Sequence, residues 1–511
     1  MRKRSGSGFV YIIGAGPGDP GLVTLKAVEC LKSADAVLYD RLANPCLLDF
    51  ARPGAELIFA GKGPSRHSMT QEEINDALAK LAKSGLVVAR LKGGDPYVFG
   101  RGGEEALHLQ ALGIPFEIVP GISAFSAVPA YAGIPVTHRG MNSTAAIVTG
   151  HEDPSKEDSD VDYSRLAGIG TIVFFMGVKN LPFITKKLIE HGKSPDTPAA
   201  VIERGTTPLQ RTISATLSTI CERVSAEGIE PPAIFIAGEN VSLRSRLNWY
   251  ENLPLFGRRI VVTRTREQSS EMAGKLSRLG AEVLKLHSIR IIDPYDGFAS
   301  LFVAFSDFEK YRAVVFTSVN GVSRFFRKLS DRGMDARDLA GKVVAAIGSK
   351  TAAELENYQI KADLVPSEFR GEALARKIAA RFGDRKVDIL LARAQEAGEA
   401  VPDELKAAGH RIHDVAVYKT IKETNHSPEV LESIRSGKID MLTFASSQTV
   451  ENFVDIVGGD HVAKWAGSVK CAAIGPVTAK TCRKHGFSVD VTPSEYTIDA
   501  LVDGITEYYR P

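Results

Sequence analysis

The chain has 511 residues, of which 44% are hydrophobic and 24% are charged. This length is enough for more than two ordinary domains, and the composition is typical of globular proteins. Lysine and arginine (63) nearly balance aspartate and glutamate (61), so the formal net charge is only +2. A general attraction to nucleic acid is therefore not expected, and an acidic ligand would have to be recognised by local basic clusters.

No apolar stretch is long enough to span a bilayer, and the basic residues 2–4 are not followed by the apolar region of a signal peptide. The five cysteines show no spacing typical of disulfide pairs or metal sites. We therefore expect a cytoplasmic protein that has no membrane segment and binds no metal.

Residues 90–105 (RLKGGDPYVFGRGGEE) contain five glycines and follow an apolar run, 86–89, that is typical of a short buried strand. The glycines and Pro96 prevent regular structure and let the backbone approach a ligand. A helical pattern resumes at 106–112. We predict a binding loop at the carboxyl end of a parallel strand, where open α/β sheets bind ligands. Asp95 can accept hydrogen bonds from a ligand there; a turn with a solvated aspartate is the alternative.

A second glycine-rich segment, 14–21, follows a predicted strand at 9–13 and precedes a helix that opens at 22–27. A dinucleotide fingerprint requires a third glycine at the position of Asp19, and Pro17 removes a backbone donor. The segment therefore favours a tight turn that binds something other than a dinucleotide.

Ionisable side chains follow two further predicted strands, 36–39 and 57–60. Asp40 follows the first and Lys62 the second; the alternatives are a helix N-cap and a solvated lysine. If the sheet is parallel, both lie at the same edge as the glycine-rich loops. Arginines near these ends predict a basic rim for a polyanionic substrate: Arg41, Arg66, Arg90, Arg101 and Arg139.

A strand at 116–119 then leads through Ser123 and Ala124 into a helix of small residues, and residues 133–139 close the first lobe. The alternation of strands and loops continues in a second predicted lobe, with strands near 145–151, 171–176, 199–205 and 233–238.

Four motifs, in this order, resemble the uroporphyrinogen-III C-methyltransferases, which are tetrapyrrole methylases: residues 14–21, 90–105, 119–124 and 133–139. The resemblance covers residues 8–248. It implies two α/β lobes with S-adenosyl-L-methionine between them, usually in a homodimer. Asp40 and Lys62 match the family's proposed proton acceptor and donor. The cofactor contacts implied by position are Pro17, Gly93, Gly94, Asp95, Val98, Ser123, Ala124, Met176 and Gly205. Many family members have threonine at position 123, and serine keeps the hydroxyl.

The resemblance implies two methyl transfers to uroporphyrinogen III, which give precorrin-2 for siroheme or cobalamin. A sulfonium is already a strong methyl donor, so the main task is to align the methyl group with the nucleophilic ring carbon. Asp40 can take up the proton that is released, and Lys62 can supply one. The oxidase and chelatase domain of the bifunctional siroheme synthases has no counterpart in this sequence.

After a predicted packed linker at 249–257, the C-terminal half contains an internal duplication. Residues 345–352 and 472–479 are identical at six of eight positions, with an offset of 127. Similar segments recur along both copies: 366–369 and 493–496, 315–318 and 443–446, 260–264 and 389–393. The duplication predicts two similar doubly wound lobes with a ligand cleft between them.

These motifs resemble the uroporphyrinogen-III synthases over residues 258–511, and imply one lobe of 258–288 with 420–511 and another of 292–415. That family closes linear hydroxymethylbilane to uroporphyrinogen III without a cofactor. Tyr418 matches the tyrosine proposed to assist loss of the hydroxyl; a half-buried hinge tyrosine is the alternative. Three hydroxyls at strand-to-helix turns are predicted to hold substrate carboxylates or to be N-caps: Ser318, Ser446 and Thr478.

The sequence thus predicts an α/β chain with a two-lobed tetrapyrrole methylase fold (1–248) followed by a two-lobed, internally duplicated, doubly wound synthase (258–511). The preferred interpretation is a bifunctional enzyme of tetrapyrrole biosynthesis, with small-molecule tetrapyrroles and a second copy as partners, and no nucleic acid or membrane. One alternative is a methylase for a later corrin precursor or an RNA base. Another is a methylase fused to a non-catalytic ligand-binding sensor.

Overall fold

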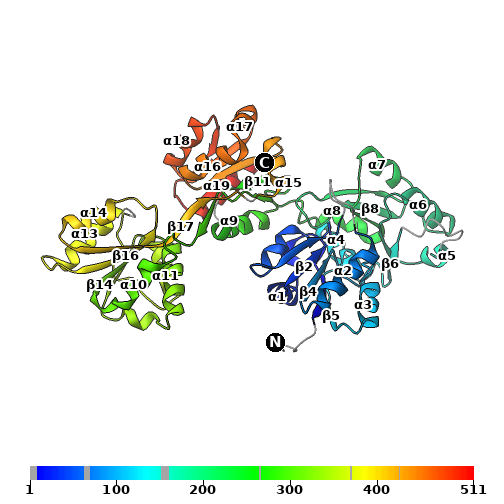
Figure 1. The fold of residues 1–511 in the computed structure, drawn as a ribbon. Helices are drawn as coiled ribbons and strands as arrows, with labels where there is room; N and C mark the ends of the chain where they lie inside the picture. Colours follow the sequence, from blue (N-terminus) through cyan, green and yellow to red (C-terminus); the bar gives the residue numbers. More distant parts are fainter. Residues whose placement is uncertain are drawn as a thin grey trace. The chain divides into compact units, whose positions relative to one another are not determined.

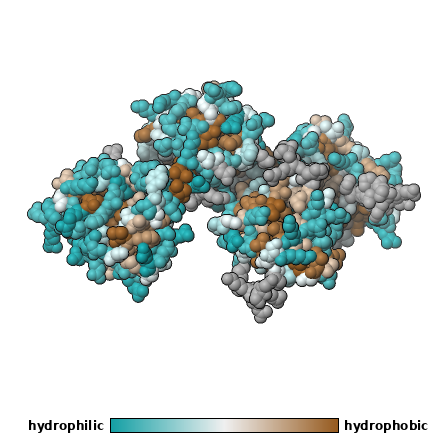
Figure 2. Space-filling view, viewed as in Figure 1, coloured by the Kyte–Doolittle hydropathy of each residue, from teal (hydrophilic) through white to brown (hydrophobic). Residues whose placement is uncertain are grey.

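The computed structural model describes residues 8–61, 69–150, 160–263, 266–368, 371–424 and 426–510. Two compact units are described separately below (Figure 1): Met1–Arg259 with Lys275–Val283 and Thr506–Pro511, and Ile260–Gly274 with Leu284–Ile505. Within the described ranges, every helix is too short or too polar to cross a membrane. On the face drawn in Figure 2, hydrophilic residues predominate and hydrophobic residues form small patches, as is usual for globular surfaces.

The first lobe of the N-terminal unit has five parallel strands in the order β3-β2-β4-β1-β5. The strands are β1 (Phe9–Gly14), β2 (Ala36–Tyr39), β3 (Glu56–Phe59), β4 (Val87–Lys92) and β5 (Phe116–Val119). Apolar residues on one face pack against α2 (Gln71–Lys83) and α3 (Gly102–Ala111), and those on the other face against α1 (Leu25–Ser33). Because the strands are parallel, the five loops at their carboxyl ends leave the sheet at one edge.

The chain after β1 differs from its prediction. The helix expected to open at 22–27 is preceded by a short 3-10 turn, η1 (Pro20–Leu22), and α1 begins only at Leu25, after the N-cap Thr24. A second 3-10 segment, η2 (Pro45–Phe50), follows β2. Proline is the first residue of both η1 and η2. It is tolerated there because the N–H that it lacks would have no hydrogen-bond acceptor within the turn.

The second lobe is a mixed sheet in the order β6-β7-β10-β8-β9. The strands are β6 (Ala145–Thr149), β7 (Thr171–Phe175), β8 (Pro198–Glu203), β9 (Arg211–Thr216) and β10 (Ala233–Gly238). The β6–β7 pair is parallel, and the other pairs are antiparallel. One face packs against α5 (Tyr163–Leu166), α6 (Leu181–Glu190) and α7 (Ile220–Ala226). The other face packs against α4 (Ala124–Tyr131). This helix follows β5, the last strand of the first lobe, and so connects the two lobes.

After β10, the N-terminal half of the chain continues in η3 (Glu239–Leu243), α8 (Arg244–Leu247) and a packed aromatic segment. Tyr250 and Leu255 are buried. The ring of Tyr131, at the end of α4, contacts those of Trp249 and Tyr250, with centroids 5.0 and 4.7 Å away. The connector between the halves is therefore packed, although its limits, 249–257, stay a prediction.

The C-terminal unit is built on two sheets, in the orders β12-β11-β18-β19-β20 and β13-β17-β16-β14-β15. The first has β11 (Arg259–Val262), β12 (Glu282–Lys285), β18 (Met441–Phe444), β19 (Lys470–Ala473) and β20 (Val489–Val491). The second has β13 (Ile289–Ile292), β14 (Tyr311–Phe316), β15 (Val343–Ala346), β16 (Asp388–Ala394) and β17 (Arg411–Lys422). In the second sheet, only the β13–β17 pair is antiparallel.

Helices cover both faces of the sheet that contains β14 and β16 (Figure 1). On one face lie α10 (Ala299–Ser306), η4 (Phe308–Lys310), α11 (Val319–Asp331), η5 (Ala336–Leu339) and α12 (Ser349–Glu356); on the other lie α13 (Gly371–Phe382) and α14 (Ala400–Ala407). The sheet that contains β18 packs against α15 (Pro428–Arg435), α16 (Ser447–Val457), α17 (Gly459–Trp465) and α18 (Pro476–Lys484). The remaining helices are α9 (Arg266–Arg278) and α19 (Ile498–Tyr509).

The predicted duplication is confirmed in the fold, down to single hydrogen bonds. Strands β17-β16-β14-β15 are ordered like β12-β11-β18-β19. The backbone N–H of Val344 donates to Asp363 Oδ2 at 2.7 Å, and that of Cys471 donates to Asp490 Oδ2 at 3.0 Å. Both residues of each pair are 127 positions from their counterparts, so the same side chain closes the same edge in each copy.

His410, between α14 and β17, is expected to make this lobe sensitive to acid. Both of its ring nitrogens are buried without a hydrogen-bond partner. Burial, and then the charge of Lys386, lower its pKa from the usual 6.5. The folded lobe therefore binds this proton less readily than the unfolded chain does. The free energy of unfolding of this lobe should therefore have its full value above about pH 6.5. It should fall as the pH drops from there toward the lowered pKa of His410 in the folded state.

His410→Leu should remove this acid sensitivity, because leucine fills the site beside Phe382 without titrating. The measurement is hydrogen exchange of peptides from β17, with wild type and variant compared at one pH above and one well below the usual histidine pKa. His461→Gln, at an exposed histidine, is the control. Equal exchange of wild type and His410→Leu at the acid pH would contradict the prediction.

Candidate functional site

The two glycine-rich segments meet at the carboxyl edge of the first sheet. The N–H of Ala15 donates to the carbonyl of Lys92 at 2.7 Å, and Gly16 and Gly94 exchange two backbone hydrogen bonds of 3.1 and 2.7 Å. The prediction that the whole of 90–105 is loop is wrong at both ends, because β4 continues to Lys92 and α3 already begins at Gly102. The loop proper begins at Gly93.

Three glycines at this edge, Gly14, Gly94 and Gly121, are called the glycine floor below. A Cβ on Gly121 would lie 2.3 Å from the carbonyl oxygen of Gly94, and one on Gly14 would lie 2.5 Å from Gly121 Cα. Gly94 has φ of +66°, which favours glycine. Gly14 and Gly121 must therefore lack side chains for the three loops to approach this closely, whereas Gly94 is favoured by its φ angle alone.

The carboxylate of Asp95 holds two of these loops together. Its Oδ1 accepts the N–H of Tyr97 at 2.8 Å, and its Oδ2 accepts the N–H of Gly121 at 3.0 Å. Its contacts in the structure thus organise the loops after β4 and β5. The role of Asp95 as a ligand acceptor stays a prediction.

Strained backbone gathers in the loops that carry the predicted cofactor residues. Seven non-glycine residues of the described chain have φ in the left-handed region. Five of them follow β4, β7 and β8: Phe99, Arg101, Met176, Arg204 and Thr206. Such conformations cost roughly 1–3 kcal/mol each and concentrate at ligand sites.

Loops of the two lobes contact one another within this unit. The N–H of Asp19 donates to Thr206 Oγ1 at 3.1 Å, and the rings of Phe99 and Phe175 lie 5.2 Å apart. Asp19 Oδ2 also accepts the hydroxyl of Tyr131 at 2.7 Å. Burial, and then this carboxylate, raise the pKa of Tyr131. The side chain of Asp19, which stands where a dinucleotide fingerprint has its third glycine, thus connects α4 with the turn of η1.

Eight of the nine predicted cofactor residues lie on the loops after β1, β4, β5, β7 and β8, and the ninth, Ala124, is the first residue of α4. Ser123 is buried at the N-cap of α4 and makes no capping hydrogen bond, and Met176 is 51% exposed. Gly205 is packed so tightly that a Cβ would lie 2.3 Å from the side chain of Val128. Sequence reasoning missed Phe99, Thr206 and Tyr131, whose contacts join segments far apart in the chain.

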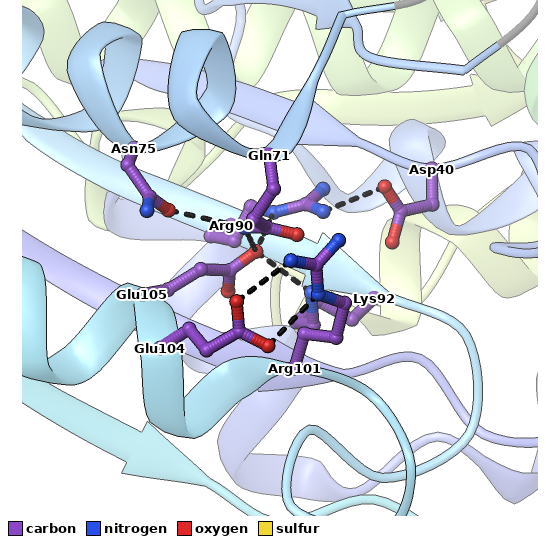
Figure 3. A network of polar contacts seen from close by, with 8 residues as sticks. All are labelled: Asp40, Gln71, Asn75, Arg90, Lys92, Arg101, Glu104 and Glu105. Carbon is purple, nitrogen blue, oxygen red and sulfur yellow. Dashed lines mark hydrogen bonds and ion pairs between the residues drawn. The ribbon is translucent and has the colours of Figure 1, made fainter. Parts of the chain in front are cut away.

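Beside the glycine floor lies a buried charge network, defined as Asp40, Gln71, Arg90, Lys92 and Glu105 (Figure 3). Arg90 Nη2 lies 2.7 Å from Asp40 Oδ1, and Arg90 Nε lies 3.0 Å from Glu105 Oε1. Arg90 is only 1% exposed, so its prediction as part of a basic rim is wrong. Burial, and then the charge of Arg90, lower the pKa of Lys92. The alternative role of Asp40 as a helix N-cap is wrong, because its carboxylate pairs with Arg90 and the N-cap of the next helical segment, η2, is Asn44.

The other predicted substrate arginines differ in their surroundings. Arg41 and Arg139 are exposed. Arg101 is also exposed and forms a bidentate ion pair with Glu104 (Figure 3). Its Nε lies 2.8 Å from Oε1 of Glu104, and its Nη2 lies 2.7 Å from Oε2. Lys62 and Arg66 lie outside the described residues.

In the C-terminal unit, two predicted residues lie in contact. The hydroxyl of Tyr418 donates to Ser318 Oγ at 3.0 Å. Tyr418 is 8% exposed, and burial raises its pKa. Ser318 is also the N-cap of α11, since its Oγ accepts the N–H of Gly321 at 3.0 Å. Tyr418, inside β17, is thus buried beside the start of α11, where the partly exposed Ser318 accepts its hydrogen bond.

The remaining two hydroxyls belong to the other lobe. Ser446 is the N-cap of α16, with its Oγ accepting the N–H of Thr449 at 3.3 Å. Thr478 is buried within α18, whose N-cap is Gly475. The N-cap alternative is therefore confirmed for Ser318 and Ser446 and wrong for Thr478, and the substrate contacts stay predictions.

Comparisons with known proteins match both halves. Residues 10–221 match the family described as Tetrapyrrole (Corrin/Porphyrin) Methylases, and residues 270–503 match Uroporphyrinogen-III synthase HemD. "Porphyrin biosynthesis protein HemD" of Ruminiclostridium josui is 37% identical over 98% of both chains. A "Uroporphyrinogen-III C-methyltransferase" of Bacillus subtilis (strain 168) is 44% identical over 71% of this chain and 75% of its own. One from Priestia megaterium is 52% identical over 46% of this chain and 99% of its own.

The two family matches follow one another along the chain, and the similarity to the relative from Ruminiclostridium josui extends over almost the entire length of both proteins. The chain therefore belongs to the family of proteins in which a tetrapyrrole methylase domain is followed by a uroporphyrinogen-III synthase domain.

Proposed function

We propose that the chain is a bifunctional enzyme that cyclises hydroxymethylbilane to uroporphyrinogen III and methylates the product twice, to precorrin-2, for siroheme or cobalamin. The observation that carries this proposal is the fusion itself, because the product of the second domain is the substrate of the first. The domain limits 1–248 and 258–511, and a homodimer through the methylase half, are part of the proposal.

The five loops around the glycine floor suit S-adenosyl-L-methionine, which supplies an electrophilic methyl group when bound. Nothing lies within 4 Å of the position that a Cβ on Gly94 would take, so the backbone there is open to a ligand. Ser123 keeps its hydroxyl free of a capping bond. Met176 and Gly205 bring the second lobe to the same place. These residues, with Asp95 bracing the loops, would hold the cofactor.

Asp40 is the residue to which we assign proton uptake from the tetrapyrrole. Its side chain is 29% exposed, while that of its partner Arg90 is 2% exposed, so the carboxylate lies at the boundary between the buried network and solvent. A carboxylate in this place can accept a proton as the ring carbon is methylated. Exposed Arg41 and Arg139 are suited to substrate carboxylates, because guanidinium groups bind carboxylates through paired hydrogen bonds.

In the synthase domain, Tyr418 is assigned to the departing hydroxyl of the bilane. The phenol is protonated at neutral pH, and its proton, donated to Ser318 Oγ in this structure, would be donated to the departing hydroxyl when the bilane is bound. Tyr418→Phe should slow formation of isomer III several-fold and raise the proportion of isomer I, since a single hydrogen bond contributes about 1 kcal/mol. The measurement is the rate of isomer III formation and the isomer ratio.

Tyr311→Phe is the matched control for Tyr418→Phe, because Tyr311 is a buried tyrosine of the same hydrophobic core. If Tyr311→Phe changes the isomer ratio as much as Tyr418→Phe does, the phenol of Tyr418 supports the lobe rather than the chemistry. A wild-type rate and ratio in folded Tyr418→Phe would return this tyrosine to a hinge role.

The proposal as a whole is tested by giving the full chain hydroxymethylbilane and S-adenosyl-L-methionine and identifying the product by mass and absorption spectrum. Precorrin-2 is the expected product. Formation of isomer I alone, together with methylation of added uroporphyrinogen III, would instead favour a methylase fused to a ligand-binding sensor.

A further inference from the structure

Glu105 is the centre of the buried charge network. It lies on α3, and its side chain is 0% exposed. Its Oε1 accepts hydrogen bonds from Arg90 Nε at 3.0 Å, Lys92 Nζ at 2.7 Å and Gln71 Nε2 at 3.3 Å (Figure 3). Donors from β4 and α2 therefore converge on one carboxylate oxygen, which fixes the position of each donor.

Arg90 joins this centre to Asp40. Its guanidinium contacts Glu105 through Nε and Asp40 through Nη2, while its Nη1 is buried without a partner. Glu105 Oε2 is also buried without a partner. A buried network with unsatisfied atoms is a poor source of stability. Its arrangement therefore needs another explanation.

Among the charged residues of the network, Asp40 is the one whose side chain is partly exposed to solvent. Side-chain exposure is 2% for Arg90, 4% for Lys92 and 0% for Glu105, but 29% for Asp40. The backbone of Asp40 is also held, because its N–H donates to the carbonyl of Leu91 at 3.2 Å. With the backbone fixed, the remaining freedom of Asp40 is the rotation of its side chain, and Arg90 is the group that restricts it.

We propose that Arg90, anchored by Glu105, is a positioning residue that holds the carboxylate of Asp40 in the orientation needed for proton uptake. This inference rests on the function proposed above for Asp40. A planar guanidinium can contact two carboxylates in a fixed geometry, which an ammonium cannot reproduce. Its contact with Glu105 prevents it from turning with Asp40. The charges that face Asp40 are those of Arg90 and, behind it, Lys92.

The test is a double-mutant cycle of Arg90→Gln and Asp40→Asn in the full chain, with methyl transfer to uroporphyrinogen III measured in single turnovers. Arg90→Gln should slow transfer about 10- to 100-fold, the loss expected for a misplaced catalytic group. Affinity for S-adenosyl-L-methionine, measured by calorimetry, should change less than about twofold. In the Asp40→Asn background, Arg90→Gln should have almost no further effect, because the carboxylate to be positioned is gone.

Two further variants keep the outcome clear. Arg90→Lys retains the buried charge and should fold, yet it should also lose rate, and lose it only when Asp40 is present. Arg52→Gln removes the ion pair between Arg52 and Asp35 next to the amino end of β2, and should leave the rate unchanged.

The inference is overturned if Arg90→Gln slows the Asp40→Asn protein by the same factor as wild type, or if cofactor affinity falls in parallel with rate. A wild-type rate in Arg90→Lys also overturns it. An inactive wild-type chain, or a fully active Asp40→Asn variant, would reject the proposed function itself, and these two results are seen before any Arg90 variant is made.

Discussion

Asp40→Asn is expected to lower the rate of methyl transfer about a hundredfold or more, which is the usual contribution of a general base. Asparagine has the same shape and still reaches Arg90, but it cannot take up a proton. The affinity for S-adenosyl-L-methionine should stay close to the wild-type value, since the side chain of Asp40 contacts Arg90 and not the glycine floor. Single-turnover methylation and calorimetric titration of the cofactor measure the two quantities.

Asp35→Asn is the matched control, because Asp35 precedes the same strand and pairs with Arg52 and the N–H of Val87. That variant removes a charge at the opposite end of β2 and should methylate normally. If cofactor binding by Asp40→Asn fell as much as turnover, Asp40 would be a structural residue of the loop after β2.

Gly121→Ala is expected to abolish cofactor binding or weaken it at least tenfold. The added methyl group would lie 2.3 Å from the carbonyl oxygen of Gly94 and 2.7 Å from Gly14 Cα, and backbone atoms cannot move aside as a flexible side chain can. The loops after β1, β4 and β5 would separate, with an overpacking cost of about 1–3 kcal/mol. Calorimetry with S-adenosyl-L-methionine and thermal unfolding would measure both effects.

Gly103→Ala is the control for this substitution. Gly103 lies in α3, and no atom is within 4 Å of the position of its added Cβ. Alanine there should leave binding unchanged and stabilise the helix by up to about 1 kcal/mol. Normal cofactor affinity in Gly121→Ala would show that the loops tolerate separation and that the close approach is not needed for the site.

The sequence was most informative where structure is local. The apolar runs at 9–13 and 116–119 are strands, as their composition predicts. The glycine-rich segment 90–105 is a loop only in its middle part, since 90–92 belong to β4 and 102–105 to α3. The end of β4 could not be predicted in this way, because Arg90 and Lys92 argue against a buried strand. Their burial depends on Glu105, which lies on the next helix and cannot be paired with them from the pattern alone.

Contacts between the two lobes of the N-terminal unit could not be predicted from the sequence either. The hydrogen bonds that Asp19 makes with Thr206 and Tyr131 join segments more than a hundred residues apart. Nothing in a local pattern shows which distant hydroxyl a carboxylate will meet. The glycines were expected to let the backbone approach a ligand, because a local pattern does not show which other loop lies next to them. The structure shows that Gly14 and Gly121 allow the backbones of neighbouring loops to approach one another.

The order of strands in the C-terminal unit has a consequence for the history of the chain. Along the sequence, β11 and β12 begin one copy, which β14 and β15 complete; β16 and β17 begin the next, which β18 and β19 complete. Each sheet, however, combines the beginning of one copy with the end of the other. The unit thus has the architecture of a strand-exchanged dimer whose two subunits were fused end to end. A cut between the copies, near residues 383–387, would divide both lobes, so neither fragment would carry a complete sheet, and only the two together could restore the fold.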